Sequence, residues 1–266
     1  MGQMRSPAVT RMVEDHLMLI WKAYEWPGGE PSTTELAARL RVTPSTVSAN
    51  LKKLARDGFI EYEPYGSIVL TDEGHRIAVA TVRRHRIIET FLAQQLGLSW
   101  DLVHDEADRL EHAVSDLVLD RMNDAIGAPT VDPHGDPIPA ADGTMPPDLS
   151  RAITELPVGA SCTVTRVSDR SPEVLRLLTE RGVTVGATVE VRAVNLPAEM
   201  IELSFGARRI ELSLAAAAAI RVSPGPPEPA ASPPPSSDPA WAPEPGPEPG
   251  PEPHPGSDPD PDPGPA

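Results

Sequence analysis

Residues of the types that bind divalent metals cluster in one segment, between positions 103 and 112. On a helix, positions i, i+4, i+7 and i+8 share one face, and here they are His104, Asp108, Glu111 and His112. Apolar residues on the neighbouring face predict that this face lies beside a buried seam. Burying carboxylates next to such a seam costs free energy of folding unless a cation neutralises them. Any one of these residues alone is better explained as a solvated surface group, but the set predicts a metal site.

A second pair of candidate ligands precedes this segment. His85 and Glu89 stand four residues apart in a stretch that also carries Val82 and Ile88, so they share a helical face with apolar neighbours. Two antiparallel helices joined by residues 97–99 would bring this pair close to the first set. The two helices together therefore offer three histidines and three carboxylates.

The chemistry of these donors limits the choice of metal. Imidazole nitrogens and carboxylate oxygens without a thiolate suit Mn(II), allow Fe(II), Co(II) or Ni(II) to compete, and argue against Cu(I). Cys162 is the only cysteine, so the chain has neither an internal disulfide nor a multi-cysteine zinc site. It also lacks a His-Glu-x-x-His motif, a nucleophile motif and an oxyanion motif. We therefore expect a protein that is not an enzyme and takes no small organic substrate.

The residues upstream predict a helix-turn-helix followed by a β-hairpin wing, which places one helix in the major groove of DNA. The predicted elements are helices over residues 13–26, 33–40 and 44–57 and strands over 59–63 and 67–70. Pro44 suits the first position of the third helix, and Gly58 suits its C-terminal cap. The alternative is a three-helix module that only contacts other proteins.

The third helix carries the side chains that we expect to contact DNA. Its amino terminus offers short polar groups for base edges and phosphates, and its second half offers cations for phosphates. The predicted contacts are Thr43, Pro44, Ser45, Thr46, Ser48, Asn50, Lys52, Lys53 and Arg56. Tyr65 and Gly66, at the tip of the wing, are expected to touch the adjacent backbone.

The remaining segments separate a helical region from a β-rich one. Long helices are expected from Thr71 to Leu96 and from Ser99 to about Met122. A proline-rich linker follows, in which His134 is interpreted as a turn residue rather than a metal ligand. The segments beyond it predict a small barrel, with strands over 162–167, 188–194, 200–203 and 208–212 and a helix over 172–181.

The charge of the chain is uneven. Its formal net charge is −16, but eight acids and no Lys or Arg lie between Ser223 and Ala266, with 19 of the 33 prolines. This tail is expected to be extended and disordered, with Trp241 as either a chance residue or a docking anchor. The acidity of the whole chain therefore does not exclude DNA binding. The absence of an eighteen-residue apolar run and of a signal peptide predicts a cytoplasmic protein without a membrane segment.

Three segments together carry a resemblance to a known family. VRRHRIIETFL (82–92), VHDEADRLEHAVSD (103–116) and DPHGDPIP (132–139) resemble the diphtheria toxin repressor family of metal-dependent regulators. The similarity is greatest to its actinobacterial manganese-dependent members, called MntR, and extends over about residues 10–222.

The resemblance implies two metal sites. The principal site would use Asp15 in the EDHL segment with Asp108, Glu111 and His112, and His85 commonly completes one of the sites. The ancillary site would use His85, Glu89 and His104 with acids of the barrel, namely Glu173 and less surely Asp169. Iron-responsive members carry Met and Cys at the positions of Asp15 and Asp108, so the two carboxylates here agree with manganese. Met18 stands where shorter manganese regulators carry a Glu ligand, and it is expected in the core.

The resulting expectation is an α+β protein of five parts. They are a winged helix-turn-helix (10–72), a helical dimerisation and metal-binding domain (73–140), a linker (141–156), an SH3-like, FeoA-like barrel (157–222) and a disordered acidic proline-rich tail (223–266). The family implies a metal-loaded homodimer that binds palindromic double-stranded operator DNA and represses metal-uptake genes. The alternatives are an iron-dependent regulator of the same family, a metal-dependent hydrolase with a winged-helix targeting domain, and a winged-helix repressor that answers to an organic ligand.

Overall fold

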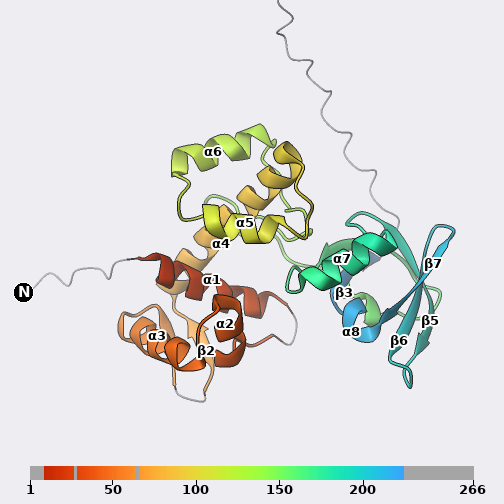
Figure 1. Cartoon of the computed structure of the whole chain (residues 1–266), viewed down its shortest axis with the longest axis horizontal. Coiled ribbons are helices and arrows are strands. Elements are labelled where there is room, and N and C mark those ends of the chain that lie inside the picture. Colours follow the sequence, from red (N-terminus) through yellow and green to blue (C-terminus); the bar gives the residue numbers. More distant parts are fainter. Residues whose placement is uncertain (1–8, 27–28, 64–65, 225–266) are drawn as a thin grey trace, which may run out of the picture. The chain divides into compact units, whose positions relative to one another are not determined.

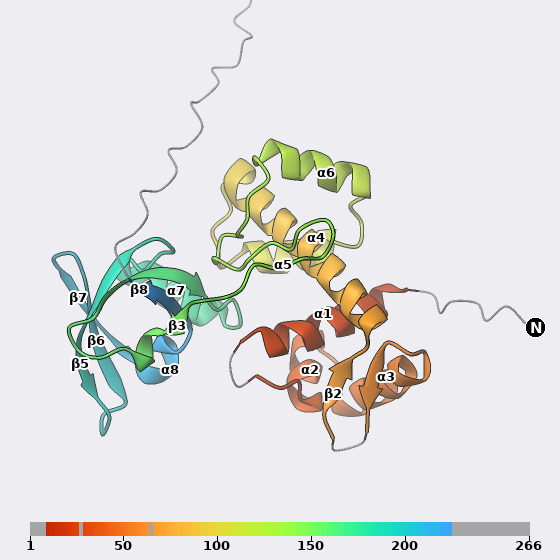
Figure 2. The same ribbon diagram turned by 180° about the vertical axis from the view of Figure 1, so that it is seen from behind.

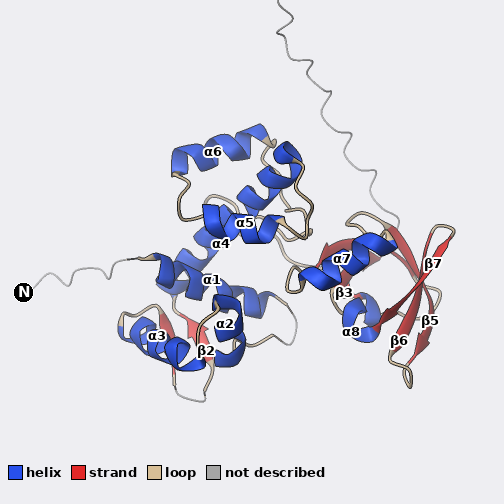
Figure 3. Ribbon diagram, viewed as in Figure 1, coloured by secondary structure: helices blue, strands red, loops and turns tan. Residues whose placement is uncertain are grey.

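The computed structural model describes residues 9–26, 29–63 and 66–224 (Figures 1 and 3). Tyr65 at the wing tip, and Trp241 with nearly all of the acidic tail, lie outside the described residues. Within them, the predicted mixture of a winged helix-turn-helix, a helical region and a β-sheet region is confirmed. None of the described helices is both long enough and apolar enough to cross a bilayer.

The amino-terminal part is a winged helix-turn-helix. Its elements are α1 (Arg11–Glu25), α2 (Thr33–Leu40), α3 (Pro44–Arg56), β1 (Ile60–Tyr62) and β2 (Ile68–Leu70). Leu17 and Ile20 of α1 pack with Val47 and Leu51 of α3, and none of the four is exposed. Local residues mark where the helices begin. The side chain of Ser32 accepts from Glu35 N and caps α2, and Pro44 occupies the first turn of α3.

The helical part is built around α4 (Asp72–Leu96), which packs against α1, α5 (Val103–Leu110) and α6 (Asp116–Ala125) (Figure 2). Because α4 contacts both α1 and α5, it brings the expected ligands of the first and fifth helices towards one another.

The prediction of one helix from Ser99 to Met122 was wrong. The first helix ends at Leu110, and a turn over residues 111–114 follows. Ser115 then caps α6, its side chain accepting from Val118 N. A serine suits a cap because its side chain satisfies an amide that the helix leaves free. Glu111 nevertheless keeps a helical backbone as the C-cap of α5, so the expected spacing of His104, Asp108 and Glu111 survives.

The carboxy-terminal part is a six-stranded antiparallel sheet of order β3-β8-β4-β5-β6-β7. Its elements are β3 (Arg151–Ala152), a short 3₁₀ turn (Ile153–Glu155), β4 (Ser161–Val167), α7 (Pro172–Arg181), β5 (Thr188–Asn195), β6 (Met200–Phe205), β7 (Arg208–Ser213), α8 (Leu214–Ala217) and β8 (Ile220–Pro224). It has its own core, which includes Val164, Leu175 and Leu203. The loop after β4 carries Asp169, a buried residue.

Candidate metal centre and nucleic-acid interface

Asp15 of α1, with Glu111 and His112 at the end of α5, forms a first set of candidate ligands, called here the outer group. His112 Nε2 lies 2.7 Å from Asp15 Oδ1 and 3.2 Å from Glu111 Oε1. One ligand atom of each residue lies within 4.8 Å of the others. The outer group therefore joins the first helix of the DNA-binding part to the helical part.

Glu14, which sequence reasoning missed, orients His112. The imidazole donates from Nδ1 to Glu14 Oε2 at 2.8 Å, so Nε2 faces Asp15 and Glu111. The hydrogen bond to Glu111 and the nearby carboxylate charges outweigh burial and raise the pKa of His112 to about 9. A carboxylate that holds the outer nitrogen of an imidazole is a common support for a metal-binding histidine.

Glu111 links the outer group to a middle group formed by His85, His104 and Asp108. Its side chain is 1% exposed, and its Oε2 accepts from His85 Nδ1 at 2.7 Å. Burial acts to raise the pKa of Glu111, but His112 and His85 lower it to about 2. Burial acts to lower the pKa of His85, but Glu89 and Glu111 raise it to about 10. These charges stabilise each other in a space that a divalent cation could share.

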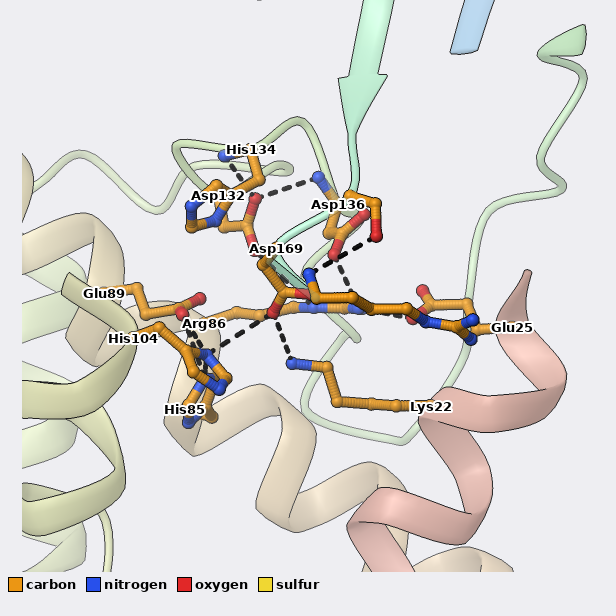
Figure 4. Close-up of polar contacts among 12 residues, drawn as sticks. Lys22, Glu25, His85, Arg86, Glu89, His104, Asp132, His134, Asp136 and Asp169 are labelled. Atoms are coloured by element: carbon orange, nitrogen blue, oxygen red, sulfur yellow. Dashed lines mark hydrogen bonds and ion pairs between the residues drawn. The ribbon is translucent and has the colours of Figure 1, made fainter. Parts of the chain in front are cut away.

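The inner cluster is the third set, and it consists of Glu89, His104, Asp132, His134 and Asp169 (Figure 4). His104 Nδ1 lies 3.1 Å from Glu89 Oε1 and 3.4 Å from Asp169 Oδ2. Glu89, Asp132 and His134 also place ligand atoms within 4.8 Å of one another. Helices α4 and α5, the proline-rich loop and the loop after β4 thus meet at one buried point.

The inner cluster contains unsatisfied atoms that fit a cation. His134 donates from Nε2 to Trp100 O at 2.8 Å, and its buried Nδ1 has no hydrogen-bond partner among the described residues. Glu89 Oε2 is also buried without a partner. Burial and the charges of Asp136 and Glu89 raise the pKa of Asp132 to about 8. Such atoms cost free energy when left unpaired, and an oxygen- and nitrogen-binding divalent metal would satisfy them.

Glu173 is not brought to any of these groups. It lies in the first turn of α7 with its side chain 76% exposed, where it accepts from Ser171 Oγ and pairs with Arg176. Asp169 lies in the inner cluster instead. Met18, expected as a core residue, is buried.

Asp132 and His134 were not predicted as ligands. The structure does place His134 in a turn, which Asp132 Oδ1 stabilises by accepting from the backbone N of His134 and of Asp136. The same turn buries the imidazole completely. The alternation of acid and histidine in DPHGD was the available signal, because alternate residues of a tight loop can converge on one point.

An open cavity of about 530 Å³ reaches these groups from solvent. Its lining includes Asp15, His104, Asp108, Glu111 and Asp169. At least one candidate ligand of each group therefore lines a cavity that is open to solvent.

A buried ionic cluster lies next to the inner cluster. Arg86 Nη2 of α4 lies 2.6 Å from Glu25 Oε2 and 3.3 Å from Asp136 Oδ2. Arg166 of β4 lies 3.2 Å from Glu25 Oε1 and donates from Nε to Asp136 at 2.7 Å (Figure 4 labels Glu25, Arg86 and Asp136). Burial acts to lower the pKa of both arginines, but these carboxylates raise it. This ionic cluster joins α1, α4, the proline-rich loop and β4.

The predicted DNA-contacting residues lie on and around α3. Thr43, Pro44, Ser45, Thr46, Lys52, Lys53 and Arg56 are exposed, and Ser48 and Asn50 are half-buried. Thr43 Oγ1 accepts from Thr46 N at 3.2 Å and so caps the helix. Ser48 and Lys52 line a hollow of about 380 Å³ with Ser32 and Gly66. A cation and hydroxyls beside a helix start suit a phosphate.

Asn50 differs from the other polar residues of α3. Its Nδ2 donates to Nε2 of His16 at 3.2 Å, and His16 Nδ1 donates to Met12 O at 2.7 Å. One amide proton of Asn50 is thus held by α1, next to Asp15 of the outer group. Successive residues of α1 therefore face the candidate metal ligands and the recognition helix.

Replacing Lys53 with alanine should weaken binding to operator and random DNA alike. The slope of log affinity against log salt should become shallower by about one, because one phosphate contact is lost. Salt titrations by fluorescence anisotropy measure this slope. Thr46→Ala is the matched comparison and should lower the ratio of operator to random affinity without changing the slope. An unchanged slope for Lys53→Ala would remove this residue from the phosphate contacts.

Three family descriptions match successive parts of the chain. Residues 8–68 match "Iron dependent repressor, N-terminal DNA binding domain" and residues 71–140 match "Iron dependent repressor, metal binding and dimerisation domain". Residues 151–224 match the FeoA domain. The three matches cover nearly all of the described residues.

Individual proteins and solved structures are similar over the same region. The diphtheria toxin repressor of Corynebacterium efficiens is 32% identical over 188 residues, which are 67% of this chain and 81% of that protein. The iron-dependent repressor IdeR of Mycobacterium leprae is 34% identical over 179 residues, 63% of this chain and 78% of that protein. A manganese-dependent transcriptional repressor solved in complex with manganese is 42% identical, with a TM-score of 0.75 over 80% of this chain and 99% of that one.

Proposed function

The chain belongs to the diphtheria toxin repressor family of metal-dependent regulators, and from this premise we propose that it is a manganese-dependent repressor. It would bind palindromic operator DNA as a metal-loaded homodimer and repress genes for metal uptake. Membership of the family makes it a metal-dependent transcriptional repressor. The relatives named above are regulators and not enzymes, which argues against a metal-dependent hydrolase.

The observation that carries the choice of manganese is the pair of carboxylates at Asp15 and Asp108. Asp15 lies in the outer group and Asp108 in the middle group. Carboxylate oxygen is a harder donor than thioether or thiolate sulfur and suits Mn(II) better. The similarity to a repressor solved with manganese supports this choice, and the similarity to IdeR keeps iron as the second candidate.

The proposed sensor couples metal to DNA through α1. A divalent cation would neutralise the carboxylates of Asp15 and Glu111 and so stabilise their approach. The helix that carries Asp15 also positions Asn50 of α3 through His16. The outer group therefore fixes the recognition helix relative to the helical part, and in a dimer it fixes one recognition helix relative to the other.

Exposed apolar residues on the helical part support the dimer. Leu96 at the end of α4 is 61% exposed, and Leu117 at the start of α6 is 68% exposed. Large apolar side chains left exposed on a helical part are the kind of surface that an interface between subunits buries. The match of this part to a dimerisation domain agrees with that interpretation.

The proposal predicts both metal dependence and metal preference. A DNA fragment selected from a random pool by the Mn(II)-loaded protein should bind tightly with Mn(II) and lose binding in chelator. The double variant Asp15→Met/Asp108→Cys should shift activation away from Mn(II) towards Fe(II), Co(II) and Ni(II), because sulfur ligands favour softer ions. Anisotropy titrations with each metal measure the order of potency.

Glu173→Gln is the control for that double variant, because the structure leaves Glu173 outside the three groups. It should keep the parent's order of potency. Equal DNA affinity in Mn(II) and in chelator would contradict the whole proposal. An unchanged order of potency in the double variant would contradict only the role of ligand hardness.

A further inference from the structure

Lys22 of α1 places an ammonium group inside the inner cluster. The residue is 5% exposed, and its Nζ lies 2.8 Å from Asp169 Oδ2 (Figure 4). Burial acts to lower the pKa of Lys22, but the charges of Asp169 and Glu89 raise it. The charge of Lys22 likewise holds the pKa of Asp169 well below its usual value, against burial. The lysine and aspartate therefore form a buried ion pair.

This ion pair uses the same oxygen that a metal would use. Asp169 Oδ2 lies 2.8 Å from Lys22 Nζ and 3.4 Å from His104 Nδ1. A divalent ion held by Asp169 and His104 would lie next to the ammonium, where two positive charges repel strongly because the site is buried. The ion would either bind beside Lys22 at this cost or displace it from Asp169. Both routes weaken metal binding at this position.

We propose that Lys22 is the built-in counter-cation of the inner cluster and keeps a second divalent ion from binding there tightly. The inference rests on the proposed function only in that the outer and middle groups hold the tight, regulatory ion. Lys22 also ties α1 to the loop after β4 without metal, because its side chain joins residues 147 positions apart. The inner cluster thus acts mainly as a structural junction, and the outer group acts as the sensor.

The replacement Lys22→Met tests this role, because methionine retains a long apolar side chain but not the charge. The full chain and the variant are titrated with Mn(II), and free Mn(II) is measured by electron paramagnetic resonance. The parent should hold one ion per chain tightly. Lys22→Met should hold two, with the second ion bound at least about tenfold more tightly than in the parent. Arg209→Met is the control, because it removes one charge from an exposed pair with Glu202 and should bind as the parent does.

A second readout is stability in chelator. Lys22→Met leaves Asp169 without its lysine partner, so the melting temperature of the variant should fall below that of the parent. Saturating Mn(II) should then raise the melting temperature more in the variant than in the parent. A variant that folds only when Mn(II) is added would also support the inference, because Mn(II) would then stabilise the variant more than the parent.

Asp169→Asn gives an independent test that does not remove the lysine. It should leave the single tight ion of the parent in place, and it should abolish the second ion when combined with Lys22→Met. Loss of a tight ion from the parent on Asp169→Asn, or an unchanged isotherm for Lys22→Met, would overturn the inference. If the parent binds no Mn(II) tightly, the proposed function fails. The inference is then still judged by whether Lys22→Met gains an ion.

Discussion

Replacing Glu111 with glutamine is expected to lower Mn(II) affinity by at least about 100-fold and to remove Mn(II)-dependent operator binding. Loss of a residue that merely supports a ligand already costs roughly 10- to 100-fold in metal affinity. Glu111 is itself a candidate ligand, and its two oxygens face His85 at 2.7 Å and His112 at 3.2 Å. The substitution keeps the shape of the side chain but removes the charge that both imidazoles require.

Glu106→Gln is the matched control for this prediction. Glu106 lies on the same helix and pairs with Arg109 at the surface, so the same chemical change should alter neither metal affinity nor DNA binding. Mn(II) affinity is measured by competition with a fluorescent chelator, and DNA binding by anisotropy. Retention of Mn(II)-dependent operator binding by Glu111→Gln would show that the outer group is not the sensor.

Replacing Arg86 with methionine should lower the free energy of unfolding by about 3–5 kcal/mol, the usual cost of removing one partner of a buried ion pair. The guanidinium is 1% exposed and faces three carboxylates, those of Glu25, Asp132 and Asp136. Without it, Glu25 and Asp136 would keep only Arg166, and Asp132 would lose its arginine partner. Urea denaturation in chelator, followed by tryptophan fluorescence, measures the loss, because Trp21 packs against Arg86.

Two further variants distinguish the loss of the buried ion pairs of Arg86 from the effect of losing any arginine. Arg76→Met removes an exposed partner of Glu73 on the same helix and should change the free energy of unfolding little, because solvent screens an exposed ion pair. Asp136→Asn added to Arg86→Met should recover part of the stability, because it removes one of the uncompensated acids. A loss for Arg86→Met no larger than that for Arg76→Met would contradict the structural importance assigned to the cluster.

The elements of the fold were largely predictable because their signals are local. The cap at Ser32, the start at Pro44 and the helical spacing from Asp72 to Leu96 depend on neighbouring residues, and the structure has the helices there. The break after Leu110 was missed because no proline or glycine marks it. The only local signal for the start of α6 is Ser115, which caps its amino terminus.

The candidate site was predictable only where its ligands share a helix or two consecutive helices. Helical spacing predicts His104, Asp108 and Glu111 as ligands, whereas only the family resemblance predicts Asp15. Asp132 and Lys22 meet the inner cluster through contacts between distant segments, and the pair formed by Lys22 and Asp169 spans 147 residues. No local pattern distinguishes a lysine that will be buried from one on the surface.

The helix α1 has a consequence for how regulators of this kind can be recombined. Its residues supply the core of the winged part, the outer group through Asp15, the hold on Asn50 through His16, and the tie to Asp169 through Lys22. A chimera cut between β2 and α4 would therefore import a ligand for the metal along with the foreign recognition helix. Metal preference and operator preference are thus inherited together. Exchanging the DNA-binding part for another also exchanges one candidate ligand of the metal site, Asp15.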